Sequence, residues 1–221
     1  MFKLATNELL KLQAVSCEVP FFTEKKLIQE MKLFDEWFLT KHLSIKLSKD
    51  VQRILKEIYS FLAKQALDQP QVFVHRDYHS KNLMLSDSFS LAMIDFQDAV
   101  IGPVTYDLVS LLKDCYVDLS PSLLHSEANF FRRVLLEKGI LDSDFPFEEK
   151  FDLMGIQRHL KCAGIFARLN LRDGKHKYLS YIPRVLNYLR CSVEKYPEFS
   201  EFNQLLVEEV IPSSEIFVSI K

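Results

Sequence analysis

Apolar residues recur at helical spacing before residue 70 and again after residue 104. Thr23 can cap a helix whose apolar face repeats Leu27 and Met31, and Ser48 can cap another that ends before Pro70. The pattern predicts helices over 2–14, 23–42, 49–69, 105–116, 121–138, 147–169, 179–192 and 199–210.

The texture between these helical regions is different. Short apolar or β-branched runs at 72–74, 83–85 and 90–94 alternate with polar turns, which is typical of short strands. We find no internal repeat, linker or low-complexity tract. The chain is therefore expected to be one α+β domain over residues 1–221, mainly helical, with a small β insert.

Composition narrows the class of protein. Hydrophobic residues make up 48% and charged residues 26% of the 221 residues, and the formal net charge is -2. These values favour a globular protein over a nucleic-acid-binding one. Apolar runs of membrane-spanning length are absent from the sequence. The widely spaced cysteines predict reduced thiols, so we expect a cytoplasmic protein. The charge and the missing apolar runs lead us to expect no nucleic-acid and no membrane partner.

The β insert carries the candidate chemistry. It contains His75-Arg76-Asp77, then Asn82, and thirteen residues later Asp95-Phe96. That is the spacing of a kinase catalytic loop and its metal-binding segment. By average composition, H-x-D-x-x-x-x-N arises by chance in a chain of this length with a probability of about 1%. The spacing therefore favours phosphoryl transfer over coincidence.

Each of these side chains suits one task in that reaction. Asp77 is the candidate base that accepts the proton of the acceptor hydroxyl. Asn82 and Asp95 supply oxygen ligands of the kind that Mg²⁺ prefers, and Mg²⁺ would accompany ATP. His75 and Asp107 are expected to support the loop without touching the substrates. Asp107 opens a predicted helix and could simply cap it, but we favour a brace on the amides of the loop.

Two further side chains have open interpretations. His79 either contacts a phosphate or the substrate, or is a loop histidine bonded to backbone. Arg158 interrupts the apolar stripe of the 147–169 helix, so it needs a partner. That partner is either a structural carboxylate or an acidic group on the substrate.

With these residues in place, the chain resembles the aminoglycoside phosphotransferase and choline kinase-like superfamily. His75, Asp77, His79 and Asn82 match its H-x-D-x-H-x-x-N signature, and Asp95-Phe96 follows. The segments HRDYHSKNLM, IDFQDAVIGPVTYDLVSLLKDCY and MGIQRHLKCAGIFARLNLRDGKHKYL are similar to the anomeric kinases for N-acetylmuramate and N-acetylglucosamine. The similarity runs from about Leu9 to about residue 192.

The resemblance implies a kinase-like C-terminal lobe that transfers the γ-phosphate of ATP to the anomeric hydroxyl of an amino sugar. In that family the activity serves cell-wall recycling. Asp77 would be the base, Asn82 and Asp95 the magnesium ligands, and Asp107 the brace. Gln97, in place of the glycine of protein kinases, is a mild departure because this superfamily does not require that glycine.

The main departure is at the front of the chain. Family members begin with a β-rich lobe that binds ATP, but here the first glycine is Gly102 and no strand with a phosphate-binding lysine precedes residue 20. The chain alone is thus expected to be an inactive half, whose N-terminal lobe is missing or separately encoded. The alternatives are a non-catalytic, pseudokinase-like binding protein, or a kinase for another small alcohol such as an aminoglycoside or choline.

Overall fold

The structure, a computed structural model, describes residues 1–85 and 90–214. Its backbone contacts divide the chain into two compact units: Met1–Thr23 with Gln65–Met154, and Glu24–Lys64 with Gly155–Lys221. The expected mainly helical α+β fold with a small β insert is confirmed, and the insert forms two small antiparallel sheets. The expectation of a single domain over 1–221 stays a prediction.

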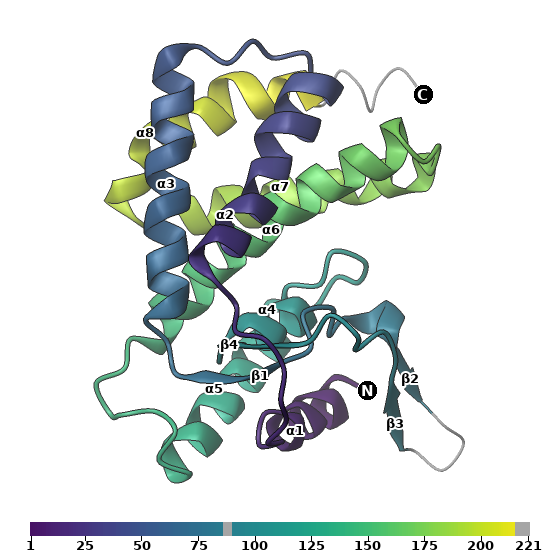
Figure 1. Ribbon diagram of the computed structural model, residues 1–221, viewed down its shortest axis with the longest axis vertical. Helices are drawn as coiled ribbons and strands as arrows, with labels where there is room; N and C mark the ends of the chain where they lie inside the picture. Colours follow the sequence, from purple (N-terminus) through teal and green to yellow (C-terminus); the bar gives the residue numbers. More distant parts are fainter. Residues whose placement is uncertain (86–89, 215–221) are drawn as a thin grey trace. The chain divides into compact units, whose positions relative to one another are not determined.

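The first unit contains two pairs of short antiparallel strands. In one pair, β1 (Gln71–Val74) runs beside β4 (Val100–Pro103), with Val74 opposite Val100. In the other, β2 (Leu83–Leu85) pairs with β3 (Leu91–Met93), with Leu83 opposite Met93. Figure 1 shows the two pairs with the loop that follows β1 between them. The β insert thus frames the candidate motif on both sides.

Strand β4 was not predicted, because Gly102-Pro103 looks like a break in the sequence. Its position is explained by close packing: a Cβ at Gly102 would lie 3.3 Å from the Phe22 ring and 3.4 Å from Val74. On the other edge of β4, the amide of Phe22 donates to the carbonyl of Ile101 at 2.8 Å. Glycine lets the backbone of β4 pass between these side chains.

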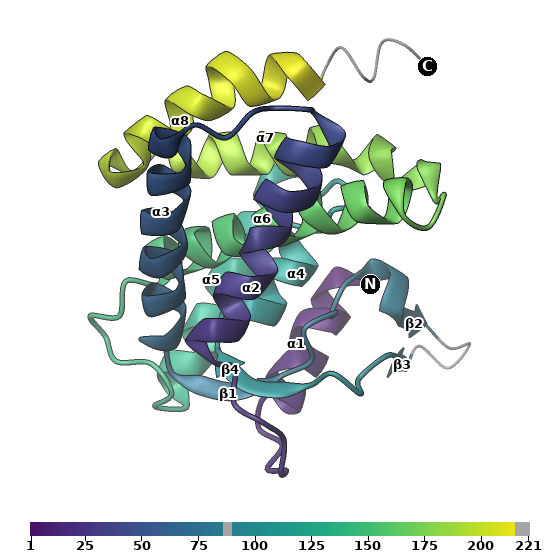
Figure 2. The same ribbon diagram turned by 45° about the horizontal axis from the view of Figure 1, so that its top comes forward.

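Helices α1 (Phe2–Leu12), α4 (Tyr106–Leu112) and α5 (Pro121–Glu137) complete most of this unit, and α6 (Phe147–Leu171) begins in it. Every residue of α4 is buried. Helix α1 packs on both α4 and α5. Figure 2 shows α1 beside the β1–β4 pair in the turned view. Ser120 caps α5 by accepting from the amide of Leu123 at 3.3 Å.

Helix α4 is shorter than the predicted 105–116, because the chain turns away after Leu112. The Lys113 ammonium lies 2.7 Å from the Asp152 carboxylate, and both side chains are buried. Asp114 accepts from the backbone amides of Ser80 at 2.8 Å and Tyr116 at 2.7 Å. Lys113 and Asp114 thus each bond a residue that is distant in the sequence.

The second unit is helical. It contains α2 (Glu24–Leu33), the π-helix η1 (Phe34–His42), most of α3 (Lys49–Leu67), the rest of α6, the 3₁₀ turns η3 (His176–Tyr181) and η4 (Pro197–Phe199), α7 (Ile182–Val193), α8 (Ser200–Leu205) and the π-helix η5 (Leu206–Val210). The predicted helices 23–42 and 199–210 therefore each change to π geometry partway. Ser48 caps α3 as expected, accepting from Val51 at 3.2 Å.

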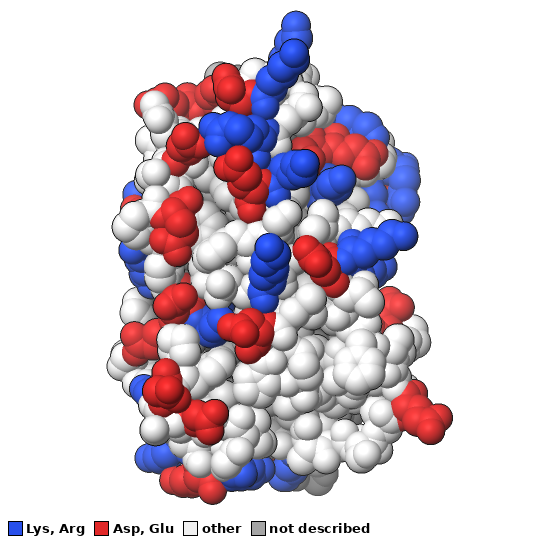
Figure 3. All heavy atoms as spheres, turned by 60° about the vertical axis from the view of Figure 1, so that its left-hand side comes forward, with Lys and Arg blue, Asp and Glu red and all other residues white. Residues whose placement is uncertain are grey.

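Aromatic side chains fill the core of this unit. The ring of Phe34 lies edge-on to Phe202 at 6.2 Å, and Phe61 to Phe199 at 5.8 Å. Lys161 and Glu30 form a buried ion pair at 3.3 Å. Figure 3 shows lysine and arginine side chains interspersed with acidic ones over the face that it presents. Within the residues described, no helix is both long and apolar enough to cross a membrane.

Helix α6 approaches the end of α2 closely at Gly164. A Cβ at this position would overlap the backbone carbonyl of Leu33, and backbone cannot yield as a flexible side chain does. We expect Gly164→Ala to lower the free energy of unfolding in urea by about 1–3 kcal/mol, the usual cost of overpacking.

The matched control for this prediction is Gly139→Ala. Gly139 has a φ of +67° and open space around its Cβ position, so only the backbone conformation is penalised, at about 1–2 kcal/mol. A Gly164→Ala protein as stable as the wild type would show that α2 and α6 do not approach each other this closely.

Candidate active site

The loop between β1 and β2 folds back on itself around Asp77. The Asp77 carbonyl accepts from the backbone amide of His79 at 3.0 Å and from the side-chain amide of Asn82 at 3.1 Å. The backbone amide of Asn82 in turn donates to the His79 carbonyl at 2.9 Å. These bonds place Asp77 and Asn82 on one short turn, although five residues separate them.

Asp107 holds the start of this loop. Its fully buried carboxylate accepts from the backbone amides of His75 at 2.6 Å and Arg76 at 3.0 Å. The first turn of α4, in which Asp107 lies, has no side-chain cap from Thr105. The carboxylate thus bonds the loop, and the nearby helix N-terminus also favours its negative charge.

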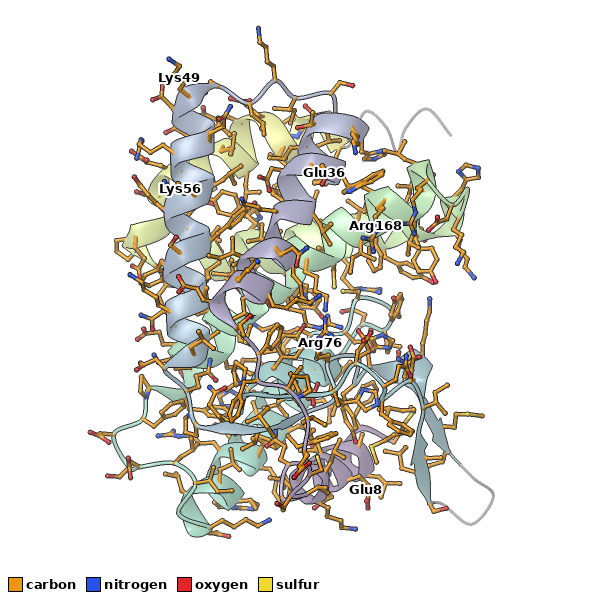
Figure 4. All side chains as sticks on the ribbon, in the orientation of Figure 1. Glu8, Glu36, Lys49, Lys56, Arg76 and Arg168 are labelled. Atoms are coloured by element: carbon orange, nitrogen blue, oxygen red, sulfur yellow. The ribbon has the colours of Figure 1, made fainter. Side chains whose placement is uncertain are left out.

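Arg76 passes through the left-handed region, with a φ of 72°. Figure 4 labels it on the loop that follows β1. Its guanidinium donates to the Asp98 carbonyl at 3.1 Å and stands over the Phe22 ring at 5.5 Å. Strained backbone of this kind persists only where the surroundings fix it. Here Asp107, Asp98 and Phe22 do so.

The second strand pair brings Asp95 next to Asn82. Because Leu83 pairs with Met93, the residues beyond them also meet, and the amide of Ile94 donates to the Asn82 carbonyl at 3.1 Å. Asp95 follows with a φ of 71°, and its carboxylate accepts from the Gln97 amide at 2.8 Å. Two residues that are thirteen apart in sequence thus lie on adjoining backbone.

His75 lies behind the loop. Its ring is buried and meets the Tyr78 ring edge-on at 6.0 Å. Burial lowers the pKa of His75, while the neighbouring carboxylates of Asp77 and Asp95 act in the opposite direction. Both carboxylates are therefore close enough to influence the same imidazole. Tyr78 is anchored in turn by a bond from its hydroxyl to the Ala5 carbonyl at 2.8 Å.

These residues fit a magnesium ion that is shared with a nucleotide. The side-chain nitrogen of Asn82 is bonded to Asp77, which leaves its oxygen as the atom to face a cation. Among the described residues, no three His, Cys, Asp or Glu side chains gather to form a metal site of their own. Magnesium needs no such cluster, because it binds through one or two carboxylates together with substrate phosphates.

Of the other sequence candidates, His79 belongs to the loop and packs its ring edge-on against Tyr116 at 5.0 Å. Arg158 is buried on α6 in the second unit, whereas the site lies in the first. Both interpretations of each residue stay predictions. Asp114 was not predicted as a site residue; its carboxylate accepts from the backbone amide of Ser80 at 2.8 Å. Its seven-residue spacing from Asp107 was the available signal.

The chain belongs to the phosphotransferase enzyme family, whose sequence model matches residues 3–135. The expected resemblance is thereby confirmed.

Individual relatives agree with this assignment. The N-acetylmuramate/N-acetylglucosamine kinase of Pseudomonas aeruginosa is 41% identical over 210 residues, which are 93% of this chain and 62% of that protein. The enzyme of the same name from Neisseria meningitidis is 40% identical over 93% of this chain and 63% of its own length. The chain thus spans less than two thirds of these relatives.

A solved structure shows the same fold at greater evolutionary distance. An ethanolamine kinase of Plasmodium vivax superposes with a TM-score of 0.59 at 16% identity, covering 90% of this chain and 60% of that one. At this identity the likeness concerns the fold alone.

The buried His75 predicts a dependence of stability on pH. In the unfolded chain its imidazole titrates near 6.5, and in the folded chain at a lower pH. As the pH falls below about 6.5, the unfolded chain binds a proton that the folded chain does not, so the free energy of unfolding falls. This contribution reaches at most about 1.4 kcal/mol per pH unit, and it ends below the folded pKa.

We expect urea denaturation between about pH 7.5 and about pH 5.5 to show this slope in the wild type and a smaller slope in His75→Gln. The exposed His125, replaced in the same way, serves as the matched control. Equal slopes in the wild type and in His75→Gln would contradict the assignment.

Proposed function

We propose that the chain carries the phosphoryl-transfer site of an ATP-dependent sugar kinase whose acceptor is N-acetylmuramate or N-acetylglucosamine. The observation that supports this most is the joining of Asp77, Asn82 and Asp95 on adjoining backbone, behind a loop held by Asp107. The names of the relatives from Pseudomonas aeruginosa and Neisseria meningitidis supply the acceptor.

Asp77 is the base in this proposal. Its carboxylate takes the proton of the acceptor hydroxyl while that oxygen forms a bond to the γ-phosphorus of ATP. The bond from the γ-phosphorus to the bridging oxygen breaks, and ADP leaves. The bonds that its carbonyl accepts from His79 and Asn82 hold its backbone in place. The protein then contributes mainly position and charge.

Asn82 and Asp95 would hold the magnesium ion that accompanies the phosphates of ATP. When bound, the ion neutralises phosphate charge and orients the γ-phosphate. Asp95 is exposed at the end of β3, where a nucleotide can reach it, and Gln97 orients its carboxylate. Asp107 keeps the loop in place, and the neutral His75 fills the space behind it.

The acceptor position in the proposal is the anomeric hydroxyl, so the product is a sugar 1-phosphate. Such a product would return recycled cell-wall sugars to nucleotide-sugar synthesis, and a cytoplasmic location would supply the ATP. The competing possibilities are an acceptor such as an aminoglycoside or choline, or a binding protein without turnover. The following experiment separates them.

The test measures ADP release and sugar phosphate formation with N-acetylmuramate, N-acetylglucosamine, an aminoglycoside and choline. The chain is assayed alone and fused to the part of the Pseudomonas aeruginosa relative that lies outside the match. We expect turnover with the two amino sugars in at least one of these forms. Asp77→Asn should lower kcat by about 10²–10⁴-fold, because the proton acceptor is lost while the geometry is kept.

Asp144→Asn is the matched control, since Asp144 is exposed on the loop between α5 and α6. Its kcat should equal that of the wild type. Turnover of Asp77→Asn at the wild-type rate would refute the assignment of the base. Turnover only with choline or an aminoglycoside would show that the acceptor is not an amino sugar. If neither the chain alone nor the fusion turns over any acceptor, the alternative of a binding protein is favoured.

A further inference from the structure

A second buried carboxylate holds the far end of the catalytic loop. Asp114 is fully buried and lies just beyond the end of α4. One of its oxygens accepts from the backbone amide of Ser80 at 2.8 Å, and the other from the amide of Tyr116 at 2.7 Å. When each oxygen of a buried carboxylate accepts a hydrogen bond from a backbone amide, the carboxylate fixes the positions of both amides.

Asp107 and Asp114 act from the two ends of one helix. Asp107 lies in the first turn of α4, and Asp114 lies two residues beyond its last residue, Leu112. The first holds the amides of His75 and Arg76, and the second holds that of Ser80. The catalytic loop, with Asp77 in its middle, is therefore bonded at its start by Asp107 and at its far end by Asp114. Helix α4 connects these two residues along the chain.

Ser80 matters because it begins the 3₁₀ turn that ends at Asn82. The amide of Asn82 donates back to His79, and its side chain donates to the Asp77 carbonyl. A shift of Ser80 would therefore move Asn82 relative to Asp77. In this way Asp114 acts on the metal ligand without touching it.

Asp114 also places Tyr116 against the loop. With its amide bonded to Asp114, Tyr116 turns its ring toward the catalytic turn. The His79 ring meets that ring edge-on at 5.0 Å, and the Lys81 ammonium lies 3.6 Å from its centroid. The residues on either side of Ser80 are thus packed against the segment that Asp114 organises.

We propose that Asp114 is a positioning residue for phosphoryl transfer, which sets Asn82 relative to Asp77 through the amide of Ser80. The inference rests on the proposed function. It implies that loss of the Ser80–Asp114 bond lowers kcat and raises the Mg²⁺ concentration needed for half-maximal rate. The KM for the sugar should change less than kcat, because the bond acts on the candidate metal ligand Asn82.

Ser80→Pro removes this one bond. Ser80 is the first residue of its 3₁₀ turn, where proline is favoured, and His79 before it is extended, with φ of −133° and ψ of 168°, as a residue before proline should be. Proline deletes the amide hydrogen and leaves Asp114 intact. Ser80→Ala keeps the amide, so the difference between these two variants isolates the bond. Asp114→Ala removes both bonds of the carboxylate.

Relative to Ser80→Ala, we expect Ser80→Pro to lower kcat by about 10–100-fold, as misplaced catalytic groups do. Asp114→Ala should lower it at least as much, and Asp118→Asn, an exposed carboxylate four residues on, should match the wild type. If Asp114→Ala fails to fold, Ser80→Pro carries the test. Equal kcat and equal Mg²⁺ dependence in Ser80→Pro and Ser80→Ala would overturn the proposal.

Amide hydrogen exchange of the chain itself keeps this test separate from the proposed function. The Asn82 amide should exchange about tenfold faster in Ser80→Pro than in Ser80→Ala, since its turn is released. If the wild type has no turnover in any form, the proposed function fails, and exchange then decides on Asp114. Unchanged exchange at Asn82 would overturn its role.

Discussion

The site depends on one interaction: the buried Asp107 carboxylate accepts the backbone amides of His75 and Arg76. A carboxylate removed from water is costly unless hydrogen bonds replace its hydration. Two amides and the first turn of α4 supply that replacement. The same bonds hold the left-handed backbone at Arg76, where the chain leaves β1 and enters the candidate catalytic loop. Without them the loop would have no fixed start.

The two strand pairs complete what the carboxylate begins. The β1–β4 pair fixes where the loop leaves, and the β2–β3 pair brings Asp95 beside Asn82. Neither pair is large, and α1 contacts β3 of the second pair. Helix α1 also packs on α4, whose residues are all buried. Two small strand pairs and one short helix thus define the geometry of the candidate site.

Local spacing allowed much of this to be predicted from the sequence. The helices follow the apolar period, and Asp77, Asn82 and Asp95 fall within one short segment. The features that could not be predicted depend on contacts between residues that are far apart in the sequence. Strand β4 exists because Phe22 and Val74 flank Gly102, and Asp114 meets the amide of a residue 34 positions earlier. The roles of the individual site residues remain predictions.

The most direct test of this account replaces magnesium with the paramagnetic ion Mn²⁺ in the presence of ATP and follows the backbone amide signals by NMR. If Asn82 and Asp95 are the protein ligands, their amides and those of Leu83 and Ile94 should broaden first, and Asp95→Asn should weaken the effect. Broadening centred elsewhere on the chain, or unaffected by Asp95→Asn, would contradict the assignment of the site.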